Sequence, residues 1–477
     1  MEKEKGKTDR LLSLIREGKR MTLGQQLRLT AYLSVPAIMA QLSSIAMQYI
    51  DASMVGSLGA NAAASIGLVS TTTWLFGGLC AAAAAGFSVQ VAHRIGARDF
   101  SEARMVFRQA VTAVLVFSFL LAVAGISVSG MLPGWLGGEE TIRRDSSLYF
   151  LIFSLFLPAL QLNFLAGGML RCSGNMRVPS MLNILMCLLD VVFNFFLIFP
   201  SRQVEWPGVA FTVPGAGLGV AGAISGTVLA ELITAGAMMW YLCRRSPMLR
   251  LSGERGGFLP RKETLCKAVR ISLPMGFEHA AICGAQIMTT VIVAPLGIVA
   301  IAANSFAIIA ESLCYMPGYG ISEAATTLVG QSLGANRIRL LRRFANITVW
   351  SGMLIMGFMG ALMYAAAPQI IGVMTPVDEI RMLGAEILRI EAFAEPMFAA
   401  SIVAYGVFVG AGGTLIPSLM NFGSIWGVRL TLAAWLAPTM GLRGVWLAMC
   451  VELCFRGVIF LVRLWSGKWI CKLRIKR

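Results

Sequence analysis

Long, nearly uncharged apolar runs are the feature of this sequence that most limits its fold. The first of them, residues 33–59, is long enough to cross a bilayer, which takes about 20 apolar residues of helix. Such runs recur along the 477-residue chain, in which only 13% of residues are charged, against about a quarter in soluble proteins. A transmembrane barrel would instead need alternating strands of about 10 residues. We therefore predict an all-α polytopic membrane protein.

Twelve apolar segments can be counted, six on each side of a polar stretch at 244–266. We expect spans at 29–55, 62–93, 106–131, 147–170, 178–200 and 215–243 in the first half, and at 267–294, 300–332, 344–370, 383–409, 415–437 and 443–465 in the second. The predicted organisation is an N-terminal segment, two six-helix lobes joined by a linker, and a basic tail, at 1–28, 29–243, 244–266, 267–465 and 466–477.

The two halves repeat each other at a constant offset in the sequence. The matched residues are mostly glycines and prolines, which indicates shared backbone geometry and close helix contacts. Examples are Pro36 with Pro274, Gly96 with Gly334, Pro158 with Pro396, and Gly174 with Gly412. Because each half has an even number of spans, a pseudo-twofold axis along the membrane normal should relate the lobes. The register breaks after the fifth helix, where the first half has an extra loop around residues 201–216.

The placement of charge indicates the orientation and the partners. A net charge of +16 could suggest nucleic acid, but Lys and Arg concentrate in the N-terminal segment, the even-numbered loops and the C-terminal tail. The positive-inside rule then puts both termini in the cytoplasm. We expect a monomeric, multi-pass protein of the plasma (inner) membrane that contacts the lipid bilayer and no nucleic acid. The N-terminal segment is expected to be either a short helix on the membrane surface or a tail without fixed structure.

Enzyme signatures are absent from the sequence. There is no Walker motif for direct ATP coupling, and no HExxH, GxSxG or paired metal-ligand motif. The ten Cys are scattered without CxxC or zinc spacing. We predict a protein that is not an enzyme, without catalytic residues, cofactor or metal. A polytopic membrane enzyme is the less favoured alternative, because no catalytic cluster stands out, and two repeated lobes favour alternating access over a channel.

Two aspartates inside the spans belong to the first half alone. At the repeat offset Thr289 stands opposite Asp51. Val428 likewise stands opposite Asp190, so the shared scaffold does not require either acid. A carboxylate in a spanning helix costs a few kcal/mol or more and is functional by default. Asn194 follows Asp190 by four residues on the same helix face. We predict that the two aspartates and Asn194 form a proton or cation coupling site; structural, hydrogen-bonded aspartates are the alternative.

Two glutamates and a proline complete the candidate set. Glu278 and Glu311 could each face a central cavity and attract a cation, or each could be the structural partner of Arg270 or of another helix. Pro36 shares a span with Asp51, and a proline inside a helix removes a backbone hydrogen bond and lets the helix bend. Pro36 is therefore a candidate hinge, with a static kink as the alternative.

Four stretches together resemble the multidrug and toxic compound extrusion (MATE) family. They are residues 35–64, 89–99 (VQVAHRIGARD), 174–199 and 301–336, and the likeness extends over about residues 29–463. The resemblance implies a V-shaped pair of lobes that alternates between inward-open and outward-open states. It also implies antiport, in which proton or sodium entry drives the export of small organic cations, drugs and other amphiphilic compounds.

The resemblance also bears on the site. Asp51 and Asp190 match the acidic positions of the branch whose N-terminal lobe holds a proton or cation site, and Glu278 loosely matches an acid of the other branch. The first branch often has Asn four residues before the second aspartate, where this chain has Met186. Since hard cations prefer oxygen ligands, protons are favoured over sodium as the coupling ion, and sodium stays open. The rival function within the superfamily is a lipid-linked oligosaccharide flippase, which usually has more spans and a basic cavity.

Overall fold

The computed structural model describes residues 2–206, 209–251 and 256–470. The first half contains α1 (Glu2–Arg16), α2 (Leu23–Gly56), α3 (Ala60–Gly96), α4 (Phe100–Val128), α5 (Leu132–Trp135), α6 (Glu140–Leu155), α7 (Leu157–Cys172), α8 (Arg177–Ile198), β1 (Pro200–Trp206), β2 (Val209–Ala216) and α9 (Gly219–Arg244). The second half contains α10 (Lys262–Val293), η1 (Ala294–Leu296), α11 (Ile298–Gly334), α12 (Ile338–Met374), α13 (Asp378–Ala392), α14 (Glu395–Gly410), α15 (Leu415–Ser424), η2 (Ile425–Arg429), α16 (Leu430–Met440) and α17 (Leu442–Ser466). Residues 252–255 of the expected linker and 471–477 of the expected tail lie outside the described residues.

The helices confirm the predicted all-α fold class. Within the described residues, nine helices are long and apolar enough to cross a membrane, and two bent pairs supply two more. The pairs are α6 with α7, bent by 49°, and α13 with α14, bent by 58°. The remaining segment is the unbroken succession of α15, η2 and α16. Several helices extend beyond the predicted runs: α2 begins at Leu23, where a capping box between Thr22 and Gln25 satisfies its first backbone N–H groups.

The sequence repeat is also present in the backbone. Positive φ angles occur at matched positions in the two halves, namely Gly59 (118°) and Gly297 (98°), Arg98 (62°) and Asn336 (56°), and Gly174 (93°) and Gly412 (79°). A residue other than glycine rarely adopts such an angle, so the Arg98 and Asn336 pair is a specific mark of a shared turn. The bends between α6 and α7 and between α13 and α14 also precede the matched prolines Pro158 and Pro396.

Two local differences break the repeat. After α8 the first half forms the antiparallel hairpin of β1 and β2, where the extra loop was expected. In the second half the counterpart of α8 is interrupted by η2, a π-helical turn. The matching residues of α8, 187–191, form a regular α-helix that contains Asp190. π-Helical turns inside α-helices often lie at functional sites.

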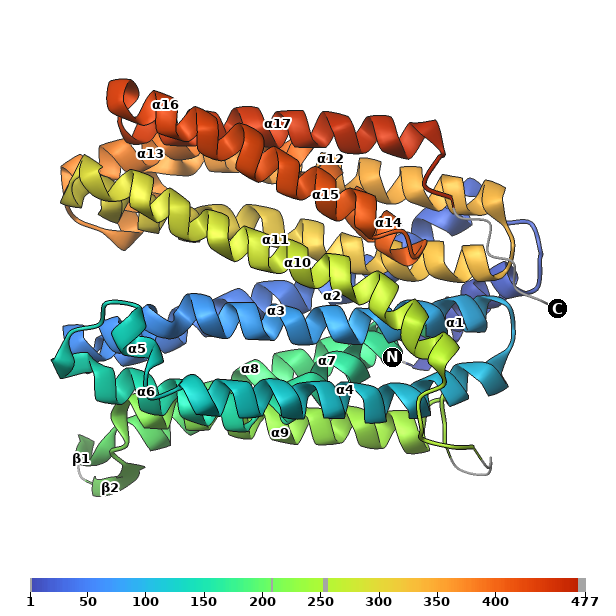
Figure 1. Ribbon diagram of the computed structural model, residues 1–477, viewed down its shortest axis with the longest axis horizontal. Helices are drawn as coiled ribbons and strands as arrows, with labels where there is room; N and C mark the ends of the chain where they lie inside the picture. Colours follow the sequence, from blue (N-terminus) through green and yellow to red (C-terminus); the bar gives the residue numbers. More distant parts are fainter. Residues whose placement is uncertain (1, 207–208, 252–255, 471–477) are drawn as a thin grey trace.

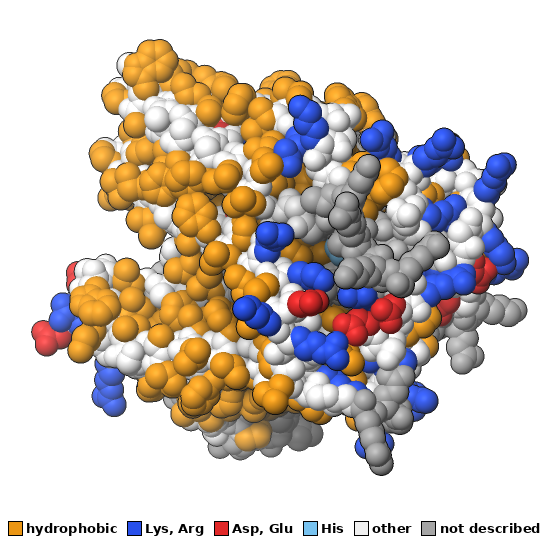
Figure 2. Space-filling view, turned by 45° about the vertical axis from the view of Figure 1, so that its right-hand side comes forward, with side chains coloured by type: hydrophobic (Ala, Val, Ile, Leu, Met, Phe, Trp, Pro, Cys, Tyr) orange, Lys and Arg blue, Asp and Glu red, His pale blue; other side chains and the backbone are white. Residues whose placement is uncertain are grey.

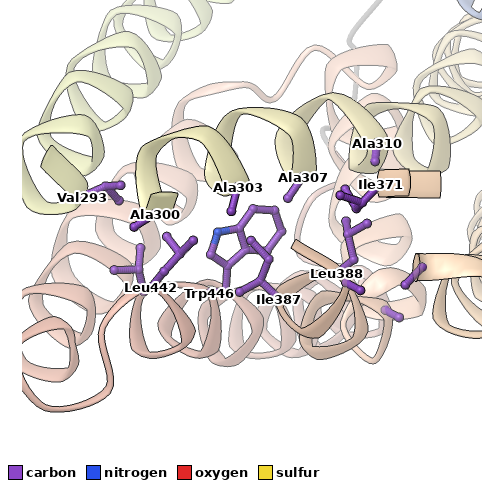
Figure 3. Close-up of a cluster of buried hydrophobic side chains, with 14 of the residues drawn as sticks. Val293, Ala300, Ala303, Ala307, Ala310, Ile371, Ile387, Leu388, Leu442 and Trp446 are labelled. Carbon is purple, nitrogen blue, oxygen red and sulfur yellow. The ribbon is translucent and has the colours of Figure 1, made fainter. Parts of the chain in front are cut away.

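The two halves form separate layers of helices (Figure 1). In the second layer, Ala300, Ala303 and Ala307 of α11 face Trp446 of α17 (Figure 3). The Trp446 side chain is buried, and its indole N–H donates a hydrogen bond to Asn304 Oδ1 (2.9 Å). Because lipid tails are as apolar as these side chains, close packing and interhelical hydrogen bonds hold such a lobe together rather than removal from water.

The lobes touch at the end of the molecule that carries both termini, here called the closed end. α3 and α11 cross there, with Gly96 against the backbone of Gln331. Gly334 lies in the same way against the backbone of His93, so a Cβ at either glycine would collide with the opposite helix. His93 Nε2 also hydrogen-bonds to the carbonyl oxygen of Gly410 (2.8 Å). At the opposite, open end a cleft separates the lobes (Figure 2).

Helix α1 lies against the closed end of both lobes. Its Leu12 and Ile15 side chains are fully buried. They belong to a cluster with Met176 from the first lobe and with Leu328 and Phe344 from the second. The N-terminal segment thus forms a helix, and its apolar side packs on protein rather than facing lipid.

Candidate functional site

Asp51 and Asp190 meet at Asn194. Helix α2 carries Asp51 near its end at the open side, and α8 carries Asp190 and Asn194 one turn apart. The Asn194 Nδ2 group donates hydrogen bonds to Asp51 Oδ1 (2.9 Å) and Asp190 Oδ2 (3.2 Å). An amide nitrogen carries two hydrogens, so both bonds can exist together. The three residues proposed from the sequence therefore lie in direct contact.

The two aspartates lie among neutral and acidic side chains. Asp190 and Asn194 are fully buried, and Asp51 is half-buried. The two carboxyl groups interact with each other, and Thr227, whose hydroxyl donates to the Ala223 carbonyl (3.2 Å), also acts on Asp190. Among the described residues no Lys or Arg acts on either aspartate, and Asp190 Oδ1 and Asn194 Oδ1 lack hydrogen-bond partners. Two adjacent buried carboxylates are unfavourable when both are charged, so this arrangement can hold a shared proton or a small cation.

Gly226 positions the neighbouring helix α9 against this group. A Cβ at Gly226 would overlap the Asn194 side-chain oxygen and approach its backbone nitrogen. Small residues of this kind allow membrane helices to approach closely. The close approach sets the next residue, Thr227, against Asp190.

A cavity of about 110 Å³ lies beside the pair, inside the same lobe. Thr73, Tyr149, Thr227 and Glu231 contribute its polar groups, and the other lining residues are apolar. Glu231 acts electrostatically on both Tyr149 and Asp190. Tyr149 and Thr227 were not identified from the sequence, because both residue types are common in packed helices. The available signal was the four-residue spacing of Thr227 and Glu231, which puts them on one helix face.

The site has only some of the oxygen ligands that a sodium ion would need. Met186, one turn before Asp190, accepts a contact from Asn163 Nδ2 to its sulfur (3.6 Å). A hard cation prefers six or more oxygen ligands, and a thioether supplies none. In the part of the chain that the structure describes, no group of three or more His, Cys, Asp or Glu side chains could hold a metal ion.

Glu278 lies buried in the second lobe among polar, neutral side chains. Ser418 Oγ donates a hydrogen bond to Glu278 Oε2 (2.8 Å), and Asn421 Nδ2 donates one to Oε1. The Tyr405 hydroxyl lies 3.5 Å from Ser418 Oγ, and Tyr405 and Arg456 both act on this carboxylate. Its neighbours therefore come from α14, α15 and α17 of its own lobe.

Glu311 belongs to a larger charged cluster in the same lobe. It is buried on α11, where Arg429 and Arg456 act on it electrostatically. Both arginines form their short ion pairs with Glu452 instead, at 2.7 Å from Arg429 and 3.1 Å from Arg456. These two arginines thus share Glu452 as their short ion-pair partner.

Glu391 and Glu395 are buried acids that sequence reasoning passed over. Both are fully buried, and their carboxyl oxygens have no hydrogen-bond partner among the described residues. Both acids lie towards the middle of the predicted span 383–409, and the bend between α13 and α14 falls between them. The available signal was Pro396, which repeats Pro158 and marks the bend.

The candidate hinge Pro36 lies where the two lobes meet. Helix α2 continues through it without interruption. Two residues further on, the Ile38 backbone lies so close to Gly320 of α11 that a Cβ at Gly320 would collide with it. A change of bend at Pro36 would therefore reach the contact between the lobes.

Comparison with known proteins gives consistent matches over both lobes. The family model described as MatE matches residues 36–196 and 274–435. "Probable multidrug resistance protein NorM" of Thermotoga maritima is 25% identical over 460 residues, which cover 92% of each chain. "Probable multidrug resistance protein YoeA" of Bacillus subtilis is 22% identical over 416 residues, covering 86% of this chain and 88% of its own.

Solved structures share the fold over nearly the whole chain. An outward-facing conformation of a multidrug resistance MATE family transporter superimposes with a TM-score of 0.84 at 20% identity, covering 94% of this chain and 100% of that one. A mutant of the Vibrio cholerae MATE transporter VcmN gives a TM-score of 0.83 at 17% identity, covering 97% of this chain and 98% of that one. These similarities confirm the predicted architecture of two six-helix lobes.

Proposed function

The chain belongs to the MatE family of transporters, and from this premise we propose that it is a proton-coupled antiporter that exports small amphiphilic organic compounds. The protein is a transporter and not an enzyme. The observation that carries the proposal is the contact of Asp51, Asn194 and Asp190 inside the first lobe without a basic partner. Such a carboxyl pair can bind and release a proton as its surroundings change.

The arrangement of the lobes supports alternating access. The lobes pack together at the closed end and stand apart at the open end (Figure 2). Basic loops assign the closed end to the cytoplasm, so the conformation is outward-facing and both termini are cytoplasmic in the plasma (inner) membrane. One chain supplies both lobes and the cleft between them, so the protein acts as a monomer.

The exported compounds are inferred from the cleft and from the relatives. Apolar side chains dominate the walls of the cleft that face the viewer in Figure 2. Apolar walls bind the apolar part of an amphiphile, and a cationic compound would also be drawn towards the buried carboxylates. The relatives named as multidrug resistance proteins support a broad range of compounds.

Proton entry from outside would compete with such a compound. A proton shared by Asp51 and Asp190 removes the negative charge that attracts a cation. It also changes the hydrogen bonds that α2 makes to α8. Because α2 reaches the lobe contact at Pro36, this change can bias the balance between the two conformations.

The rival function, a lipid-linked oligosaccharide flippase, has less support. Such a cargo carries phosphate groups, which are recognised by available Arg and Lys side chains. Arg429 and Arg456, two basic residues inside the second lobe, both pair with Glu452. Their charge is already compensated within the lobe.

Reconstitution in proteoliposomes tests the proposed function. A panel of cationic dyes is loaded, and a proton gradient or a sodium gradient is imposed separately. We expect the proton gradient alone to drive transport, and D51N and D190N to reduce it to the background rate. The matched control is D145N, the same change at an exposed aspartate on α6 of the same lobe.

Two results would contradict the proposal. Transport driven by neither gradient would exclude antiport for these compounds, and transport driven only by sodium would exclude protons as the coupling ion. Full proton-driven transport in both D51N and D190N would remove the aspartate pair from the coupling site.

A further inference from the structure

Glu231 lies at the same depth in the first lobe as Asp190. It follows Thr227 by one helical turn on α9, which packs beside α8. At 1.5 Å per residue, Glu231 and Asp190 each lie roughly 20 Å along their helices from the closed end. The two acids therefore occupy the same layer of the lobe on neighbouring helices.

The 110 Å³ cavity connects the surroundings of the two acids. Glu231 lines the cavity, and so does Thr227, which also acts on Asp190. One water molecule takes up about 30 Å³ of liquid, so a cavity of this size with polar side chains in its wall has room for water. Water in the cavity would thus reach both Glu231 and Thr227, the neighbour of Asp190.

The groups that face Glu231 do not stabilise its carboxylate in the charged form. Three titratable side chains interact with it electrostatically: Tyr149 of α6, Asp190 of α8 and Cys80 of α3. Each of these is neutral or negative. No Lys or Arg lines the cavity. Glu231 is half-buried, and a carboxylate partly withdrawn from water without a positive partner is costly in its charged form.

We infer that Glu231 binds a second proton in the transport cycle, in addition to the proton shared by Asp51 and Asp190. The carboxylate takes this proton from water that enters the cavity and later returns it, so one O–H bond forms and the same bond breaks. The inference deepens the proposed antiport function, on which it rests.

The number of protons moved per transported dye molecule tests the inference. Proteoliposomes are held at zero membrane potential, and the steady-state dye ratio is measured at pH differences of zero and one unit. Each coupled proton contributes a factor of about ten per pH unit. The E231Q variant should therefore reach a ratio about tenfold lower than the unmodified protein at one pH unit. E140Q, at an exposed glutamate of the same lobe, should match the unmodified protein.

The outcomes separate this inference from the antiport proposal. If the unmodified protein ignores the pH gradient, the antiport proposal itself fails. If the unmodified protein responds and E231Q reaches the same ratio, only the role of Glu231 is overturned. If E231Q does not transport at all, E231D decides: recovery supports a protonated carboxyl, and continued inactivity overturns the coupling role.

Helix α1 bridges the two lobes at the closed end. The Arg16 guanidinium hydrogen-bonds to Gln331 of the second lobe (3.3 Å) and to the Ser173 carbonyl of the first lobe (3.4 Å). Arg337 of the second lobe donates to the Leu14 carbonyl (2.9 Å). Burial lowers the pKa of Arg16 to about 10, so this bridge stays charged at neutral pH. The same helix buries Leu12 between the lobes.

We propose that α1 is a latch that holds the two lobes together at the closed end. An inward-open state must separate the lobes there, and α1 cannot keep its contacts with both lobes when they part. Alternating access therefore requires α1 to release at least one lobe in every cycle, and the latch favours the outward-facing state.

Hydrogen exchange measured by mass spectrometry tests the latch on the full chain. In I15E a charge enters the buried contact, and the backbone at residues 327–334 should exchange faster than in the unmodified protein. L23E, the same change at an exposed leucine of α2, should leave this exchange unchanged. Deletion of residues 2–16 is the second variant and should act like I15E. Unchanged exchange at residues 327–334 in either variant would overturn the latch, even if antiport itself is intact.

Discussion

The two lobes share a backbone but treat their buried acids differently. In the first lobe, Asp51 and Asp190 have only neutral hydrogen-bond partners, chiefly Asn194. In the second lobe, Arg429 and Arg456 both bind Glu452. An ion-paired carboxylate keeps its charge, whereas one with neutral partners can be neutralised by a proton. The second lobe, as far as the structure describes it, also holds Glu278, Glu391 and Glu395 without a short ion pair, so the contrast concerns the matched segment: a carboxyl pair in the first lobe and an ion pair in the second.

The two lobes differ in one matched segment, residues 187–191 of α8 and the η2 turn at Ile425–Arg429. Val428 takes the place of Asp190, and it lies in the π-helical turn η2. The next residue, Arg429, reaches Glu452 on α17. The two lobes therefore share helix positions and bends, while the residues at one matched turn differ: a buried carboxyl group in the first lobe and an ion-paired arginine in the second.

The largest expected effect on stability comes from breaking the ion pairs of the second lobe. E452Q removes the short ion-pair partner that Arg429 and Arg456 share in a buried site, which costs about 3–5 kcal/mol. Thermal unfolding of the purified variant in detergent should show a strong loss of stability. E386Q, which breaks the exposed pair with Arg443, should cost at most about 1 kcal/mol. Equal effects of the two changes would remove the distinction drawn for Glu452.

A smaller loss of stability is expected when the Asn194 amide, which bridges Asp51 and Asp190, is removed. N194A removes the donor shared by Asp51 and Asp190 and should cost about 1–3 kcal/mol. The two carboxylates need this donor most when both are charged, so the loss should be larger at pH 8 than at pH 6. Thermal unfolding at both pH values measures it, with N346A, at an exposed position of α12, as the control. A loss that does not vary with pH would indicate a purely structural bridge.

A variant in the second lobe tests whether proton coupling is confined to the first lobe. E278Q removes a buried charge but keeps a side chain of the same shape beside Ser418 and Asn421. If coupling belongs to the first lobe, proton-driven dye transport should keep its dependence on the pH gradient. A variant that inserts and binds dye but no longer responds to the gradient would move the coupling site to Glu278.

The smallest effect is expected at the hinge. P36A restores a backbone donor inside α2 and should slow transport without changing the number of coupled protons. The rate and the steady-state dye ratio, measured in the same proteoliposomes, separate the two quantities. P274A, at the matched position of the second lobe, is the control. A changed steady-state ratio in P36A would show that the proline affects coupling itself.

Much of this molecule follows from its sequence. The apolar runs, the repeat and the first-half acids predicted the spans, the lobes and the contact of Asp51, Asp190 and Asn194. Helical spacing was sufficient for the last of these, since Asp190 and Asn194 share a face and α2 and α8 are neighbours.

Other features depend on tertiary packing that no local pattern contains. A run of apolar residues has the same pattern whether the helix is straight or bent, so the bend beside Glu391 and Glu395 was not predicted. The amphipathic pattern of α1 fits a membrane surface as well as a protein surface, and only the shape of the closed end makes it dock there. Arg429, which pairs with Glu452, lies in a π-helical turn. The residue types of this segment do not predict such a turn.

Proton release on dye binding tests the central claim most directly. Purified protein in weakly buffered solution is titrated with a cationic dye that the proteoliposome assay identifies as transported, and the released protons are counted with a pH indicator. Release is expected from the unmodified protein and from E278Q, and fewer protons should be released by the D51N/D190N double variant that still binds dye. Undiminished release from the double variant would contradict the assignment of proton coupling to the Asp51–Asp190 pair.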